Sequence, residues 1–99
     1  MTTLPPLHPG EVLREEFMEP LGLSAIAVAR AIHVPRTRIE RIVNEHTGIS
    51  ADTALRLSRL FGTTPEFWLN LQSRHDVETA ERQIHDDLAA IEPLAMEAA

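Results

Sequence analysis

The sequence predicts an all-α, single-domain protein of five helices with a helical extension at its C-terminal end. Apolar residues recur at steps of three and four along most of the 99 residues, which is the period of a helix with one buried face. Pro, Gly and small capping residues separate these segments, and no stretch shows the alternation typical of a strand. We expect the domain to span residues 1–91, and residues 92–99 to fray because they contain Pro93.

The first helix is expected over residues 9–19. Pro9 suits the first turn of a helix, where its fixed φ is favourable and its missing N–H would be unpaired anyway. Pro20 and Gly22 are expected to end the helix, since neither residue continues one readily.

The second and third helices are expected over residues 25–32 and 35–45, joined by a tight turn. Ser24 is a favourable N-cap for the second helix, and Pro35 suits the first position of the third. The turn holds His33 at a position that favours Gly, and His tolerates a positive φ better than most residues do.

The fourth helix is expected over residues 51–61, with Ser50 as its N-cap and Gly62 as its left-handed stop. Thr64 followed by Pro65 has the form of an N-cap and a first helical residue. These two residues therefore mark the start of a fifth helix.

Beyond this start, an apolar stripe continues along the C-terminal extension at helical spacing. Its members are Val77, Ala80, Ile84, Leu88 and Ile91. The stripe either docks onto the chain's own core or forms a dimer interface. We favour the dimer, because a five-helix core of this length has little room left to bury it. Trp68 either anchors that interface, as Trp often does, or packs against Phe61.

The net charge of −6 is unevenly distributed along the chain. Residues 28–62 carry six Arg and three acids, a net of +3, whereas residues 1–27 sum to −3 and residues 63–99 to −6. A basic middle between acidic ends suits two different partners on two surfaces.

The composition gives no support for an enzyme, a metal site or a membrane protein. There is no Cys, and the five His form neither an HxxxH pair nor an HExxH motif. No Ser or Asp lies in a Gly-rich elbow, so we expect no catalytic residue and no cofactor. The longest apolar run has five residues, far short of the roughly 20 of a membrane span, and there is no basic-then-apolar leader. We therefore expect a cytoplasmic protein.

The second and third helices have the dimensions of a helix-turn-helix. The residues expected to face outward on the third helix are mostly Arg and small hydrogen-bonding residues: Arg36, Thr37, Arg38, Glu40, Arg41 and Asn44. Arg can bind guanine O6 and N7 together and Thr can contact a thymine methyl, so this face suits the DNA major groove. We predict that Arg36, Thr37 and Arg41 read bases. The predicted phosphate contacts are Arg38, Ser24 and Asn44.

A solvated helix face is the alternative interpretation of these arginines. The spacing also allows Arg36 to pair with Glu40, and Arg41 with Glu45, each four residues apart. Pairs of this kind would hold the side chains in position without preventing contact with DNA.

Three stretches carry a resemblance to a known family. They are HPGEVLREEFMEPLGLS (8–24), VPRTRIERIVN (34–44) and GISADTALRLSRLFGTTPEFWLNLQSRHDVETA (48–80). Together they resemble the HigA antitoxins, also called virulence-associated protein I, over residues 8–85. The resemblance implies a phage-repressor-like helix-turn-helix fold and a HigB–HigA toxin–antitoxin pair.

The same resemblance implies two activities. The antitoxin would neutralise a HigB/RelE-like, mRNA-cleaving toxin, and it would repress its own operon as a homodimer on an inverted repeat of double-stranded operator DNA. The alternative is a stand-alone helix-turn-helix repressor without a toxin partner.

The first helix carries a candidate toxin-binding surface. Glu11, Glu15 and Glu19 recur four residues apart and would therefore line one side of this helix. The resemblance implies a basic, RNA-binding toxin, to which an acidic stripe would be complementary. A solvated acidic face is the alternative.

Overall fold

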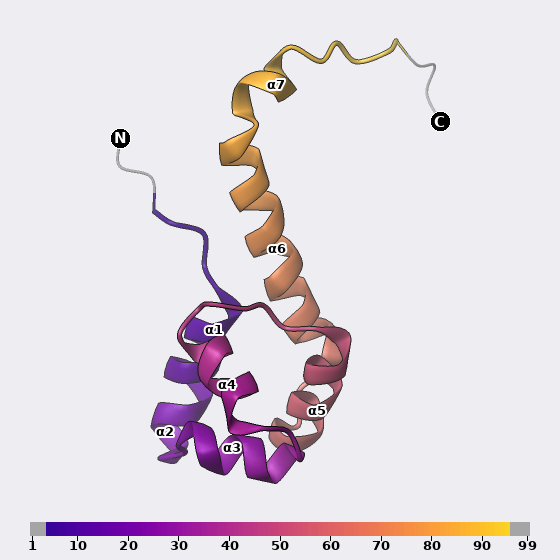
Figure 1. Cartoon of the computed structure of the whole chain (residues 1–99). Helices are drawn as coiled ribbons and strands as arrows, with labels where there is room; N and C mark the ends of the chain where they lie inside the picture. Colours follow the sequence, from indigo (N-terminus) through magenta and orange to yellow (C-terminus); the bar gives the residue numbers. More distant parts are fainter. Residues whose placement is uncertain (1–3, 96–99) are drawn as a thin grey trace.

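The computed structural model describes residues 4–95, and every regular element within them is a helix. In chain order the elements are α1 (Pro9–Val12), η1 (Leu13–Met18), α2 (Glu19–Leu21), α3 (Ala25–Ile32), α4 (Arg36–Val43), α5 (Ala51–Phe61), α6 (Pro65–Gln83) and α7 (His85–Ala89). The elements from α1 to α5 and the start of α6 form a body, and the rest of α6 carries α7 away from it (Figure 1). The predicted all-α fold is confirmed.

The first three elements form one continuous helix that runs to Leu21, so the expectation that it ends before Pro20 is wrong. The η1 segment is a wider π turn, in which the Glu19 N–H donates to the carbonyl of Arg14, five residues earlier. Proline has no N–H, and in an α-helix its ring clashes with the carbonyl four residues before it. The wide turn directly before Pro20 removes that conflict. The helix ends at Gly22, whose φ is 64°.

The predicted N-caps are confirmed at three helices. The side chains of Ser24, Ser50 and Thr64 each accept a hydrogen bond from the backbone N–H three residues later, at 3.1, 3.3 and 3.1 Å. Gly62 ends α5 with a φ of 73°. These local signals fix where α3, α5 and α6 begin.

The helix α4 is shorter than the predicted 35–45. Pro35 is its N-cap residue with a ψ of 144°, so the first helical residue is Arg36. At the other end Glu45 adopts a φ of 62°, which takes the backbone out of the helix after Asn44. The predicted left-handed conformation of His33, with a φ of 61°, is confirmed.

Trp68 lies in the centre of the core and is fully buried. Its ring centroid lies 5.1 Å from that of Phe17 and 5.0 Å from that of Phe67, and its Nε1 donates to the hydroxyl of Thr63 at 2.8 Å. The prediction that Trp68 contributes to a dimer interface is therefore wrong, because no part of the side chain is accessible to a partner. Its alternative, packing in the core with Phe61, is what the structure has.

The C-terminal segment from residue 76 to residue 95, which we call the arm, projects from the body (Figure 1). Its apolar residues Val77, Ile84, Leu88 and Ile91 are between 42 and 65% exposed, so they are not docked onto the chain's own core. The helix is interrupted at Ile84, with φ −116° and ψ 25°. Ile91 follows the end of α7, so the predicted helical stripe stops before it.

Residues 92–95 have no regular secondary structure, and the remainder of the predicted frayed tail, 96–99, lies outside the described residues. The first three residues of the predicted domain also lie outside them. No helix within residues 4–95 is long and apolar enough to cross a membrane.

Candidate nucleic-acid interface

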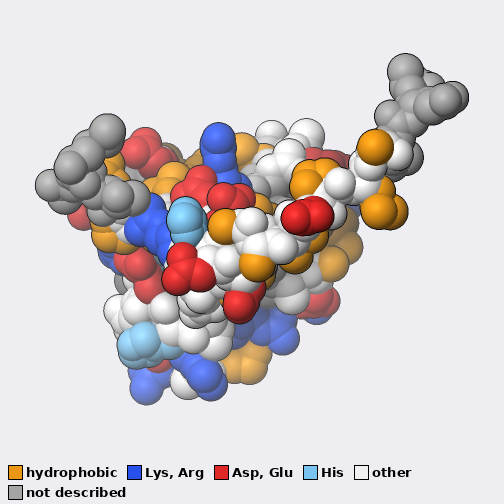
Figure 2. Space-filling view, turned by 90° about the horizontal axis from the view of Figure 1, so that it is seen from above, with side chains coloured by type: hydrophobic (Ala, Val, Ile, Leu, Met, Phe, Trp, Pro, Cys, Tyr) orange, Lys and Arg blue, Asp and Glu red, His pale blue; other side chains and the backbone are white. Residues whose placement is uncertain are grey.

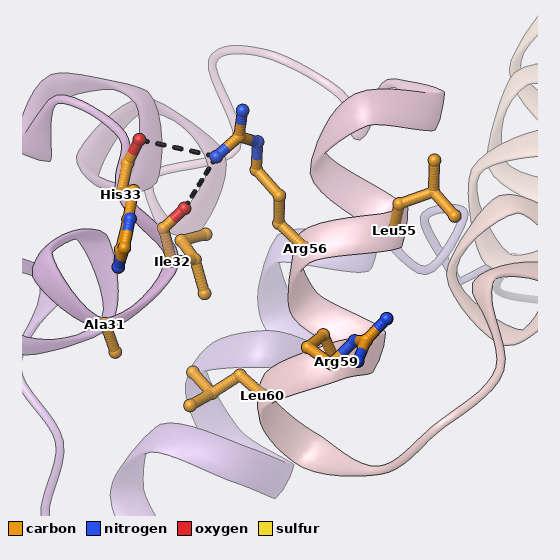
Figure 3. A pocket seen from close by; sticks show the side chains of 7 residues that line it. All are labelled: Ala31, Ile32, His33, Leu55, Arg56, Arg59 and Leu60. Atoms are coloured by element: carbon orange, nitrogen blue, oxygen red, sulfur yellow. Dashed lines mark hydrogen bonds between the residues drawn. The ribbon is translucent and has the colours of Figure 1, made fainter.

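The turn between α3 and α4 is held from two sides. The Val34 N–H donates to the carbonyl of Ala29 at 3.0 Å, which closes the end of α3. From α5, Nη1 of Arg56 donates to the carbonyl of Ile32 at 2.8 Å and to that of His33 at 3.4 Å (Figure 3). A charged donor on two carbonyls at a helix C-terminus stabilises that terminus, so Arg56 attaches the end of α3 and the following turn to α5.

The helix α4 has one buried and one exposed face. Ile39 and Ile42 are buried in the core, as the helical spacing predicts. Every residue predicted to contact DNA is exposed: Arg36, Thr37, Arg38, Arg41 and Asn44 from α4 and its C-cap, and Ser24 from the N-cap of α3. The Ser24 oxygen accepts the Ala27 N–H, and its own hydroxyl hydrogen stays free to donate.

A carboxylate on α5 binds one of these arginines. Asp52 accepts a hydrogen bond from Nη1 of Arg38 at 2.6 Å and from Nε of Arg56 at 2.9 Å. These two charged donors lower the pKa of Asp52. Arg38 is therefore held against α5 by an acid, although its side chain is still 40% exposed. Asp52 and Arg56 were not predicted as interface residues, and their only sequence signal is an acid and a base four residues apart.

Of the two ion pairs that the spacing allows on α4, the second does not form. Arg36 and Glu40 approach to 3.9 Å, as expected, but Glu45 lies 3.6 Å from Arg14 instead of pairing with Arg41. The reason is the positive φ of Glu45, which turns its side chain out of the α4 register. Arg41 therefore remains exposed and forms no ion pair within residues 4–95.

Arg14 connects the first helix to the end of α4. Its Nη1 donates to the carbonyl of Val43, the last residue of α4, and its Nη2 contacts Glu15 at 2.9 Å. The hydrogen bond that Arg14 donates to the Glu15 carboxylate is the main cause that raises the pKa of Arg14. Sequence reasoning missed this contact because it joins residues 29 positions apart.

The predicted acidic stripe on the first helix is less regular than expected. Glu15 and Glu19 are exposed and Glu11 is half-buried. The π-helical segment η1 contains Glu15 and ends directly before Glu19, so a spacing of four residues does not return to the same side as it would in an α-helix. Glu15 is also partly neutralised by Arg14.

Two short helices at a fixed turn, with a buried inner face and an arginine-rich outer face on the second, define a helix-turn-helix protein. The family described as "Helix-turn-helix" matches residues 15–68, which is more than half of the chain. The chain belongs to this family, and within it to the HigA antitoxins.

Individual relatives support this assignment. Virulence-associated protein I of Dichelobacter nodosus is 50% identical over 95 residues, covering 96% of this chain and 87% of that protein. The solved structure of Pseudomonas aeruginosa antitoxin HigA with the higBA promoter is 45% identical with a TM-score of 0.88, covering 91% of this chain and 99% of that chain. Antitoxin GraA in complex with its operator is 47% identical with a TM-score of 0.87, covering 97% and 98%. The resemblance to HigA seen in the sequence is confirmed.

Proposed function

We propose that this chain is an antitoxin that represses its own operon by inserting α4 into the major groove of operator DNA. The observation that carries the proposal is the exposed outer face of α4, which presents Arg36, Thr37 and Arg41 together while Ile39 and Ile42 are buried. Guanidinium groups and a Thr methyl on one rigid helix are what direct base readout requires. Relatives of 45 and 47% identity that were solved with promoter or operator DNA give independent support.

The roles of the individual residues follow from their positions. We assign base contacts to Arg36, Thr37 and Arg41, which lie on the outer face of α4, the first two of them in its N-terminal turn. Phosphate contacts are assigned to residues at helix ends or tied to a neighbouring helix: Ser24, Arg38 and Asn44. Helix ends are where backbone and capping groups usually meet the DNA backbone.

Repression requires two copies, since one α4 reads only a few base pairs. We propose a two-fold dimer on an inverted repeat, with half-sites about 34 Å apart, through the exposed stripe of Val77, Ile84, Leu88 and Ile91. Apolar side chains this exposed on a projecting segment are unfavourable in water unless a partner covers them.

We further propose that the acidic residues Glu11, Glu15 and Glu19 bind a basic HigB-like toxin. These residues lie on α1, η1 and α2, away from the outer face of α4, so one molecule could hold toxin and operator together. The relatives named as antitoxins support a toxin partner in general, and the acidic surface is our assignment of its position.

The proposal is tested by titrating the purified chain into fluorescently labelled DNA from upstream of its own gene. We expect specific binding that competitor DNA of unrelated sequence does not displace. Co-purification with the product of the adjacent reading frame then tests the antitoxin function. Operator binding without any co-purifying toxin would leave a stand-alone repressor, and absence of specific DNA binding would refute the proposal.

A further inference from the structure

A second exposed apolar surface lies beside the helix-turn-helix, on the outer side of α5. A groove of about 510 Å³ separates the C-terminal end of α3, with Ala31 and Ile32, from Leu55, Arg59 and Leu60 on α5 (Figure 3). Leu55 is 59% exposed and Leu60 is 37% exposed. A groove of this size accommodates a few aliphatic side chains, and leaving it open to water is unfavourable.

The rim of the groove is positively charged. Arg56 is already engaged by Asp52 and by the carbonyls of α3, but Arg59 forms no ion pair within the part of the chain that the structure describes. A bound segment that combines aliphatic and acidic side chains would therefore fill the groove with apolar groups and place a negative charge near Arg59.

The arm has this combination of side chains. It carries six acids against the single Arg82, a net of −5, interleaved with the apolar residues of the stripe. Seen from above, apolar and acidic side chains follow one another along the projecting segment (Figure 2). The arm cannot fill the groove of its own chain, because α6 leads it away from the body (Figure 1).

Charge decides between the two ways in which a second copy could cover the arm. Two arms packed against each other would bring together two segments that each carry −5, and like charges side by side at an interface are unfavourable. An arm in the groove of the other copy instead places its acids near Arg59. A two-fold axis makes this contact reciprocal, so that both arms and both grooves are covered.

We propose that the groove between α3 and α5 receives the arm of a second copy, with Ile84 and Leu88 in the groove and Asp86 or Asp87 facing Arg59. This inference rests on the proposed dimeric repressor and specifies its interface. It also places the dimer contact beside the turn that Arg56 holds, which leads into α4.

The experiment is sedimentation velocity of the full chain over a range of concentrations, with circular dichroism to confirm folding. Leu55→Glu should weaken the dimer by roughly tenfold or more, as expected for loss of an apolar interfacial contact. Because Leu55 is exposed in the single chain, this variant is expected to fold. Arg59→Glu and the double variant Asp86→Arg, Asp87→Arg should each weaken the dimer, and combining all three substitutions should restore it. Arg74→Glu, on α6 and away from the groove, is the matched control and should change nothing.

Each outcome decides one question. If Leu55→Glu and Arg59→Glu left the dimer intact while Ile84→Glu with Leu88→Glu abolished it, the two arms would pair with each other. That result would overturn the inference but keep the proposed dimer. Failure of the charge exchange to restore the dimer would also overturn it. A wild-type chain that binds its operator only as a monomer would refute the proposed dimer itself.

Discussion

Arg38 of α4 donates to the carboxylate of Asp52 on α5, with 2.6 Å between Nη1 and Oδ2. The same carboxylate binds Arg56, which in turn holds the carbonyl of Ile32 at the end of α3. One acid therefore links both helices of the helix-turn-helix to α5. In the proposed DNA complex it would compete with phosphate for the guanidinium of Arg38.

Replacing Asp52 by Asn is expected to strengthen binding to DNA of any sequence, because the competing negative charge is removed from beside Arg38. The slope of log affinity against log salt should stay close to the wild-type value, since Arg38 makes the same phosphate contact in both proteins. The ratio of operator affinity to unrelated-DNA affinity should stay unchanged, because a phosphate contact carries no sequence information. Titrations of both DNAs at several salt concentrations measure this, with Glu81→Gln on α6 as a control that removes the same charge elsewhere. Unchanged affinity for both DNAs would show that Asp52 does not compete with phosphate for Arg38.

Substitutions on the outer face of α4 should separate base readers from phosphate contacts. Arg36→Ala or Arg41→Ala should each cost roughly 1–3 kcal/mol of operator affinity and relax specificity at one base pair. Arg38→Ala should weaken binding to all sequences alike and flatten the salt slope by about one. Gel-shift titrations against operators with single base changes distinguish the two patterns, and Arg74→Ala serves as the control. If the Arg36/Arg41 double variant bound its operator normally, the site assignment would be wrong.

A histidine at the start of α1 should make stability depend on pH. The Nδ1 atom of His8 accepts the Gly10 N–H at 2.9 Å, so the ring must be unprotonated there. Burial, and next the neighbouring His75 at 4.8 Å between ring centroids, lower the pKa of His8 below its ordinary 6.5, while Glu45 and Asp76 oppose this and Arg14 adds to it. The unfolded chain therefore binds this proton more readily, and the stabilisation is present above pH 6.5 and is lost as the pH falls through the folded-state pKa.

The test of this histidine is a pair of urea-unfolding curves for wild type and His8→Asn between pH 7.5 and 5. Asn can still cap the helix with its side-chain oxygen but does not titrate in this range. The loss of unfolding free energy on acidification should be smaller in the variant than in the wild type. Equal losses in both proteins would assign the pH dependence to other groups.

Local chemistry explains which parts of the fold the sequence predicts correctly. Ser24, Ser50 and Thr64 cap their helices through residues three positions away, and Gly62 needs only its own positive φ, so each signal is complete within a few residues. The exposed arginines of α4 follow from the position of Ile39 and Ile42, which fixes the opposite face of the helix.

The errors arise where distant parts of the chain meet. The burial of Trp68 depends on Phe17, which approaches it only in the folded protein. Glu45 pairs with Arg14 because the backbone adopts a positive φ at Glu45 itself. The sequence does not indicate this turn, since the residue there is not a glycine. At Pro20 the expectation fails for a different reason, since a widened turn allows a helix to continue through a residue that usually ends one.

The acidic residues of the first helix should determine how fast a basic toxin binds. We expect Glu11→Gln, Glu15→Gln and Glu19→Gln together to slow toxin association and to make it less sensitive to salt, because long-range attraction acts mainly on the association rate. Operator affinity should change little, as these residues lie outside α3 and α4. Surface plasmon resonance at several salt concentrations measures the rates.

Glu15 requires its own variant, because it contacts Arg14, which holds the end of α4. If Glu15→Gln alone altered operator binding while Glu11→Gln with Glu19→Gln did not, the effect would act through Arg14 and the carbonyl of Val43 rather than through toxin contact. A control that changes Glu78, Glu81 and Glu92 of the arm to their amides removes three charges elsewhere and should leave toxin association unaltered. If the arm variant slowed toxin association and the first-helix variant did not, the toxin-binding surface would lie on the arm. The two variants each remove three negative charges and differ only in where those charges lie.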